Sequence, residues 1–175
     1  DNSPIWDESL NSINITDYKY SKKRIDKHKV NDDERPSDLT YERYMYLVDL
    51  FKKYNYDESE ISKNTNFLMQ DVLFNVLLLL SNYALEKIYS ILDYPEKKKI
   101  VQYWIKRTSY SLNKKLFSSD FYYSFDLIRN KLVKIKTITG LTPIILNFNV
   151  EHIKHNLTKV FLNEHYKISC LDRNE

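Results

Sequence analysis

The chain has 175 residues, of which 42% are hydrophobic and 29% charged, and its formal net charge is +3. This length and composition are typical of one globular domain and argue against wholesale disorder, and the small net charge does not indicate nucleic-acid binding. One cysteine, Cys170, excludes an internal disulfide and a cysteine-rich zinc site. One glycine, Gly140, and four prolines leave few means of turning often, which favours a few long helices.

Residues 1–36 are predicted to form a charged N-terminal arm. The chain begins at Asp1 rather than Met, and we interpret this as removal of a preceding segment, such as a signal peptide. Ser3 as N-cap and Pro4 in the first turn predict a short helix. A basic cluster then runs into an acidic one, which indicates either a solvated linker or a contact with an acidic partner or phospholipid. The basic side chains of that second interpretation are Lys22, Lys23, Arg24, Lys27 and Lys29.

Five helices are predicted after this arm. Pro36-Ser37-Asp38 opens a helix over about 38–55, and the next runs to Leu92 from a start as early as Ser59. Pro95 starts a third helix, over about 95–117. Ser118-Ser119-Asp120 caps a fourth, whose apolar residues repeat every three or four positions from Phe121 to Ile135, with Gly140 as its C′ residue. Thr142-Pro143 opens a fifth helix that continues toward Ile168.

The predicted fold class is all-α: an up-down antiparallel four-helix bundle with an additional N-terminal helix. Short connections near 93–95, 118–119 and 139–142 make consecutive helices antiparallel neighbours. The bundle is predicted to occupy 37–168, followed by a C-terminal tail over 169–175, and the protein is expected to be a monomer. The apolar run Val72–Leu80 is nine residues long, short of the ~20 that a membrane-spanning helix needs.

A narrow polar strip marks the most apolar predicted helix. At ~100° per residue its members lie on one side of that helix, with apolar residues around most of the rest. They are Asp71, Asn75, Asn82 and Glu86. The strip is either the solvated or paired edge of a central helix, or a polar layer inside the core that weakens the bundle and lets it open.

The third predicted helix carries a basic and aromatic face. Between Pro95 and Phe117 there are seven Lys or Arg residues against Glu96 alone. Such a face is either an ordinary solvated surface or a binding surface for anionic lipid or an acidic partner. Its residues are Lys97, Lys98, Lys99, Tyr103, Lys106, Arg107, Tyr110 and Lys114.

Motifs for catalysis or cofactors are not found in the sequence. His152 and His155 are three apart rather than the four of HExxH, and no third ligand accompanies them, so we predict no metal. Without a Gly-rich loop no nucleotide cofactor is predicted, and Glu42 and Asp49 are interpreted as helix-surface charges. Asn14 and Asn156 match the short glycosylation sequon. These observations predict a non-enzymatic protein with no cofactor and no small-molecule substrate.

The segments LFNVLLLLSNYALEKIYSIL and VQYWIKRTSYSLNKKL, with the helical plan over 37–168, resemble the secreted microneme proteins that malaria sporozoites need for cell traversal. That resemblance implies a secretory-organelle protein, released at the parasite surface to help the parasite pass through host cells by engaging host membrane. Partners would be anionic host membrane or a host or parasite protein, not nucleic acid. The alternative is a helical protein-interaction module similar to exported PHIST domains or viral Bcl-2-like proteins.

Overall fold

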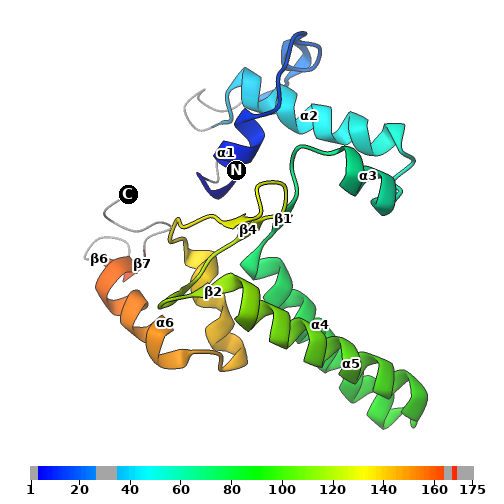
Figure 1. Ribbon diagram of the computed structural model, residues 1–175, viewed down its shortest axis with the longest axis vertical. Helices are drawn as coiled ribbons and strands as arrows, with labels where there is room; N and C mark the ends of the chain where they lie inside the picture. Colours follow the sequence, from blue (N-terminus) through cyan, green and yellow to red (C-terminus); the bar gives the residue numbers. More distant parts are fainter. Residues whose placement is uncertain (1–3, 27–34, 164–166, 169–175) are drawn as a thin grey trace. The chain divides into compact units, whose positions relative to one another are not determined.

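The computed structural model describes residues 4–26, 35–163 and 167–168, so Lys27 and Lys29 of the basic cluster and the predicted tail over 169–175 lie outside the described residues. The contacts of the chain divide it into two compact units, Asp1–Met69 and Gln70–Glu175. Figure 1 shows the helices and strands of both. Each unit has its own internal packing.

The first unit is built from short helices and a long loop. Its elements are α1 (Pro4–Asn11), the 3₁₀ turn η1 (Ser21–Lys23), α2 (Asp38–Lys53) and α3 (Glu58–Asn64), and the two-residue strand β1 (Met69–Gln70) falls at the boundary. Ser37 caps α2 by accepting a hydrogen bond from the Thr40 amide at 3.2 Å, as the sequence predicted. Its buried hydrophobic residues are Ile5, Leu10, Ile13 and Leu50.

The second unit begins with a helical hairpin. Helices α4 (Val72–Ile91) and α5 (Pro95–Ser111) pack side by side (Figure 1). Asp93 makes the reversal between them with a φ of 54°, a left-handed conformation that Asp tolerates better than most residues. The expected break at Pro95 is therefore confirmed.

Short strands and irregular helices follow the hairpin. A π-helical turn, η4 (Leu112–Leu116), leads into β2 (Phe117–Ser118), which pairs antiparallel with β3 (Phe121–Tyr122). Next, β4 (Phe125–Asp126) pairs antiparallel with β5 (Lys131–Leu132). The last described elements are η5 (Ile138–Leu146), α6 (Val150–Asn156), η6 (Leu157–Phe161) and the antiparallel pair β6 (Leu162–Asn163) and β7 (Lys167–Ile168).

One apolar cluster holds the second unit together. It joins the buried side of α4 to aromatic residues of the strands and to the later helices. Phe121 and Phe161 stack at 5.8 Å between ring centroids and are fully buried. The other members are Val72, Val76, Leu79, Leu112, Leu116, Tyr122, Tyr123, Leu141 and Ile153.

The predicted four-helix bundle is wrong. Where the sequence predicted the fourth helix, from Phe121 to Ile135, the structure has β3, β4 and β5, and the predicted fifth helix is divided among η5, α6 and η6. The argument from glycine failed because other residues make the turns: Ser119 and Asn130 take φ values of 61° and 53° between the paired strands. Short polar side chains can occupy this left-handed region, so reversals did not need glycine.

Helix α4 is the one helix in the described part of the chain that is long and apolar enough, by length and composition alone, to cross a membrane. The sequence predicted no spanning segment because it counted only the uninterrupted run Val72–Leu80. The core helix of a folded domain has the same length and composition.

Candidate functional site

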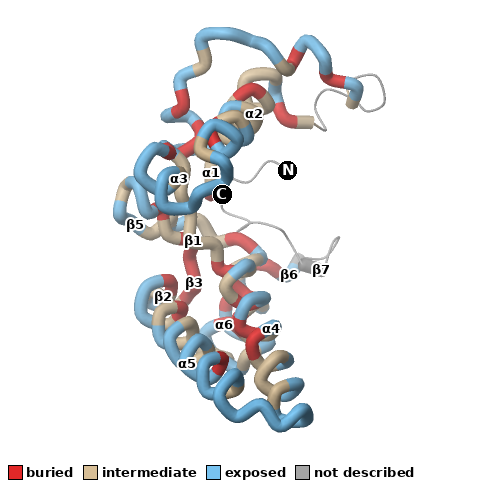
Figure 2. Tube along the Cα trace, turned by 90° about the vertical axis from the view of Figure 1, so that its right-hand side faces the viewer, coloured by how far each residue is buried: buried red, intermediate tan, exposed pale blue. Residues whose placement is uncertain are grey.

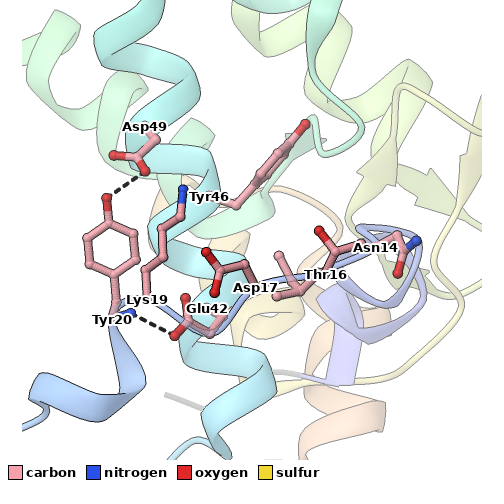
Figure 3. Close-up of a pocket in the computed structure, with 9 residues that line it drawn as sticks. Asn14, Thr16, Asp17, Lys19, Tyr20, Glu42, Tyr46 and Asp49 are labelled. Atoms are coloured by element: carbon pink, nitrogen blue, oxygen red, sulfur yellow. Dashed lines mark hydrogen bonds between the residues drawn. The ribbon is translucent and has the colours of Figure 1, made fainter.

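A cavity of about 190 Å³ lies in the first unit between the loop before η1 and one face of α2. Figure 3 shows its polar side chains converging from these two segments. Three carboxylates line it with one ammonium group, so acceptors outnumber cationic donors among its charged groups, and apolar surface makes up much of the rest. The lining residues are Asn14, Ile15, Thr16, Asp17, Lys19, Tyr20, Glu42, Tyr46 and Asp49.

Glu42 fixes the loop to the helix. Its Oε1 accepts hydrogen bonds from the backbone amides of Tyr20 and Ser21, both at 2.7 Å, and Glu42 is only 3% exposed. Burial alone would raise the pKa of Glu42, but the amide donors favour the charged form more strongly and hold the pKa below its ordinary value. Glu42 is therefore an ionised structural carboxylate, and its shift is in the wrong direction for a general acid.

Tyr20 ties the same loop to α2 a second time. Its hydroxyl donates to Asp49 Oδ2 at 2.6 Å, as Figure 3 shows. This hydrogen bond to a carboxylate raises the pKa of Tyr20, so the phenol stays protonated and keeps donating. The cavity wall is thus held at two points two helical turns apart on α2.

These contacts leave a preformed polar hollow with an aromatic side. Asp17 and Lys19 offer an acceptor and a donor, and Tyr46 contributes a half-exposed ring. Hydroxyl-rich ligands suit this combination because each hydroxyl both donates and accepts, while the C–H face of a sugar can pack on an aromatic ring. The arrangement can bind a polyhydroxylated molecule.

The sequence interpretation of Glu42 as a surface charge is wrong. The signal that could have found it is helical spacing: Glu42, Tyr46 and Leu50 are four residues apart and share one face of α2, and Leu50 is buried. A carboxylate on a buried face needs donors, which the loop amides supply. Sequence alone does not identify the loop that comes back to it.

Arg24, one of the basic residues assigned to a solvated arm or an acidic partner, is buried. Its guanidinium bonds to Asp26 at 2.7 Å, to the Pro36 carbonyl at 2.7 Å and to Asp38 at 3.2 Å, and it stacks 4.7 Å from the centre of the Tyr41 ring. The Arg24 bond also holds the pKa of Asp26 well below its usual range. Arg24 is therefore a structural link between the loop and the start of α2.

The residues of the predicted basic and aromatic face lie on α5, except Lys114, which lies in η4. Tyr103 and Tyr110 are 62% and 68% exposed, and Lys99 pairs with Glu96 at 3.0 Å. Lys97 lies over the ring of Tyr94 at 5.0 Å. The side chains that are exposed or partly exposed are Lys97, Lys98, Lys99, Tyr103, Lys106, Arg107, Tyr110 and Lys114.

The predicted polar strip divides into separate structural roles. Asp71 is the N-cap of α4, accepting from the Phe74 amide at 3.1 Å and from Ser124 Oγ at 3.2 Å. Asn75 donates to the Asp71 carbonyl at 2.7 Å. Asn82 is buried, and Glu86 accepts from Gln102 of α5 at 2.6 Å. These bonds give Asp71, Asn75 and Glu86 local partners.

Histidine and sequon predictions can also be placed. No group of three or more His, Cys, Asp or Glu residues among those described could hold a metal ion. Asn156 is 1% exposed, and its amide donates to the His152 carbonyl at 2.9 Å, while Lys136 donates to its Oδ1 at 2.8 Å. A buried side chain with both ends bonded does not suit glycosylation.

Comparison with known proteins identifies the class as glycoside hydrolases. A family model described as the mannosylglycerate hydrolase MGH1-like glycoside hydrolase domain matches residues 1–170. The chain belongs to this family.

Individual relatives support the same family assignment. The chain is 36% identical over 142 residues to the mannosylglycerate hydrolase of Rubrobacter radiotolerans, covering 77% of this chain and 31% of the relative. It is 33% identical over 146 residues to that of Thermus thermophilus, covering 82% of this chain and 34% of the relative. A glucosylglycerate hydrolase of Mycolicibacterium hassiacum is 29% identical over 92 residues, half of this chain and 20% of the relative. The chain thus spans about a third of the length of the first two relatives.

Solved structures share the fold. A GH63 mannosylglycerate hydrolase from Thermus thermophilus in complex with Tris matches with a TM-score of 0.83 and 27% identity, over 100% of this chain and 43% of that one. The same enzyme in complex with glucose matches with a TM-score of 0.83 over 99% of this chain and 42% of that one. A further structure holds Tris and D-glycerate.

These findings overturn the functional predictions from sequence. The resemblance to malaria cell-traversal proteins is wrong, as are the non-enzymatic, membrane-engaging function and the interaction-module alternative, because the family is one of glycoside hydrolases. The exclusion of small-molecule substrates is also wrong, since relatives were solved with glucose and D-glycerate. The two helical segments that suggested the resemblance are amphipathic or apolar helices, which many unrelated proteins share.

Proposed function

We propose that this protein acts in hydrolysis of the glycosidic bond between a hexose and glycerate, with mannosylglycerate or glucosylglycerate as substrate. The observation that carries the proposal is the family match over residues 1–170, supported by 36% identity to a mannosylglycerate hydrolase. Both candidate substrates are small, anionic and rich in hydroxyl groups. A site for them needs hydrogen-bond partners of both kinds.

We further propose that the cavity beside α2 binds hydroxyl groups of this substrate or of its products. The side chains of Asp17, Lys19 and Tyr46 support this role because they take no part in the Glu42 and Tyr20 hydrogen bonds that hold the wall. Its contribution is binding rather than proton transfer. Glycoside hydrolysis commonly uses two carboxyl groups, one of them a proton donor, and the lowered pKa of Glu42 does not suit a proton donor.

The test is hydrolysis by the complete gene product that carries this sequence. Mannosylglycerate and glucosylglycerate are supplied separately, and release of free hexose and glycerate is measured by chromatography. A disaccharide of the same hexose without glycerate is the control substrate. Release of glycerate from at least one glyceryl glycoside, with much slower cleavage of the control, is the expected result.

Absence of cleavage of both glyceryl glycosides by folded protein would overturn the proposed activity. The cavity is tested separately by Tyr46→Ala, with Tyr56→Ala as the matched control because Tyr56 is 66% exposed and does not line the cavity. Loss of one aromatic contact worth about 1 kcal/mol should raise KM about fivefold for Tyr46→Ala, with kcat largely kept. An unchanged KM for Tyr46→Ala would remove the cavity from the substrate site.

A further inference from the structure

Helix α4 carries a second apolar face that the described residues of the second unit leave exposed. Phe74 is 70% exposed, Leu78 48%, Ile88 49% and Leu92 54%. With Ser81 and Leu85 these residues define the α4 seam, at positions 74, 78, 81, 85, 88 and 92. Val72, Val76 and Leu79, which are buried in the core, lie on the opposite side of the helix.

The spacing of the α4 seam indicates what kind of surface it fits. Its steps alternate between four and three residues along the whole helix, which is the pattern of a helix that packs lengthwise against another helix. None of its six positions is charged, so a partner helix must also present an apolar stripe. Figure 2 shows that much of the α4–α5 hairpin, especially its distal turns, is exposed.

Contiguous apolar patches of more than a few hundred Å² are rare on monomers and mark interaction surfaces. A seam that follows a helix of 20 residues extends for about 30 Å, enough for several turns of a partner helix. Burying these exposed apolar side chains requires another element to pack on them.

The relatives are much longer than the part of them that matches this chain. The Rubrobacter and Thermus enzymes match this chain over only 31% and 34% of their length, and the solved Thermus structure matches over 43% of its chain while all of this chain is covered. More than half of that folded protein therefore lies outside the matched part. Polypeptide of that extent is the available source of helices to pack on the α4 seam.

We propose that the α4 seam is the docking face for a helix from the polypeptide that completes the glycoside hydrolase fold. This inference rests on family membership and on the exposed seam, and does not depend on which glycoside is hydrolysed. The two remaining occupants, a second copy of this chain and a membrane, are outcomes of the test.

Cysteine labelling measures the cover directly. Leu78→Cys and Ile88→Cys probe the α4 seam, and Ser90→Cys, an exposed position on the other side of α4, is the matched control. Each is made with Cys170→Ser, in this 175-residue chain and in the complete gene product. Maleimide labelling rates are read for the individual peptides by mass spectrometry, without substrate. Exchange of backbone hydrogens over Val72–Ile91 in the unsubstituted proteins gives the same comparison if a variant does not fold.

The expected result is that the two seam cysteines react at least about tenfold more slowly in the complete gene product than in the 175-residue chain, with Ser90→Cys equal in both. Equal rates at the seam in the two polypeptides would overturn the proposal. Slow labelling of the seam cysteines in the 175-residue chain that becomes fast on dilution would identify a second copy of the chain as the occupant. That result would also overturn the proposal. Slower labelling of the seam cysteines only after lipid vesicles are added would identify a membrane as the occupant and would also overturn the proposal.

Discussion

Glu42 accepts two backbone amides of the cavity loop from a position that is only 3% exposed. Hydrogen bonds to a charged acceptor are stronger than neutral ones, and a donor left without its partner costs free energy when it is buried. The geometry of residues 14–20 therefore depends on the ionised state of one side chain. The same dependence makes the loop sensitive to acid.

Replacing Glu42 with Gln should lower the free energy of unfolding by about 1.5 kcal/mol at neutral pH, because a neutral acceptor replaces a charged one. The pKa of Glu42 is lowered in the folded state, so its contribution is fully present above the unfolded value of about 4.5 and is lost as the pH falls through the lower folded value. Urea unfolding of both proteins over a pH series measures the difference. It should shrink below pH 4.5, and a difference that stays constant to strongly acidic pH would contradict the assignment.

Gly140 does not have a positive φ, so its role is to allow close packing. The sequence placed it after a helix as a C′ residue, but it lies inside η5, where an added Cβ would overlap the Phe121 ring and the Tyr122 carbonyl oxygen. Gly140→Ala should therefore destabilise the protein by about 1–3 kcal/mol. Thermal unfolding measures it, with exposed Ser119→Gly as the control. Ser119→Gly should be neutral or stabilising because it relieves a φ of 61°.

At the scale of elements, local signals identified two helix starts and were wrong at two others: a strand follows Ser118-Ser119-Asp120, and Thr142-Pro143 lies inside η5. Ser37 and Pro95 start helices where expected, because caps and first-turn prolines act through bonds within a few residues. The Phe121–Leu132 region has helical spacing but forms strands, since Phe121 packs on Phe161, forty residues later in the chain. Contacts of that range outweigh local periodicity, and one sequence does not disclose them.

The N-cap of α4 gives an element-scale prediction. Asp71 accepts from the Phe74 amide and from Ser124, so Asp71→Ala removes a helix cap together with a link to the strand region. The expected cost is about 1–2 kcal/mol of unfolding free energy, measured with urea. Asp71→Ser keeps a capping oxygen and should recover most of it. If Asp71→Ser is as unstable as Asp71→Ala, the bond to Ser124 rather than the cap is the main contribution.

At the scale of the molecule, the candidate site was the part least accessible from sequence. Its cavity combines the Asn14–Tyr20 loop with Glu42, Tyr46 and Asp49 of α2, and neither segment matches a spacing that by itself indicates sugar chemistry. Recognition of hydroxyl groups needs acceptors and donors converging from different segments, so it is a property of the fold. Conversely, the sequence showed that apolar residues surround most of the helix that became α4, but it did not indicate which of them stay exposed in this chain.

The division into Asp1–Met69 and Gln70–Glu175 predicts that each unit responds to changes in its own packing. Glu42→Gln loosens contacts of the first unit, and Leu79→Ala removes a fully buried side chain of the second at a cost of about 2–5 kcal/mol. Hydrogen exchange followed by mass spectrometry should show faster exchange over 4–26 and 35–69 in the first variant and over 70–163 in the second, because local opening follows cooperative units. Val48→Ala, at a position 37% exposed on α2, is the control and should change neither pattern. If either core variant speeds exchange equally through both units, they unfold as one, and the cavity loop then depends on the packing of the whole chain.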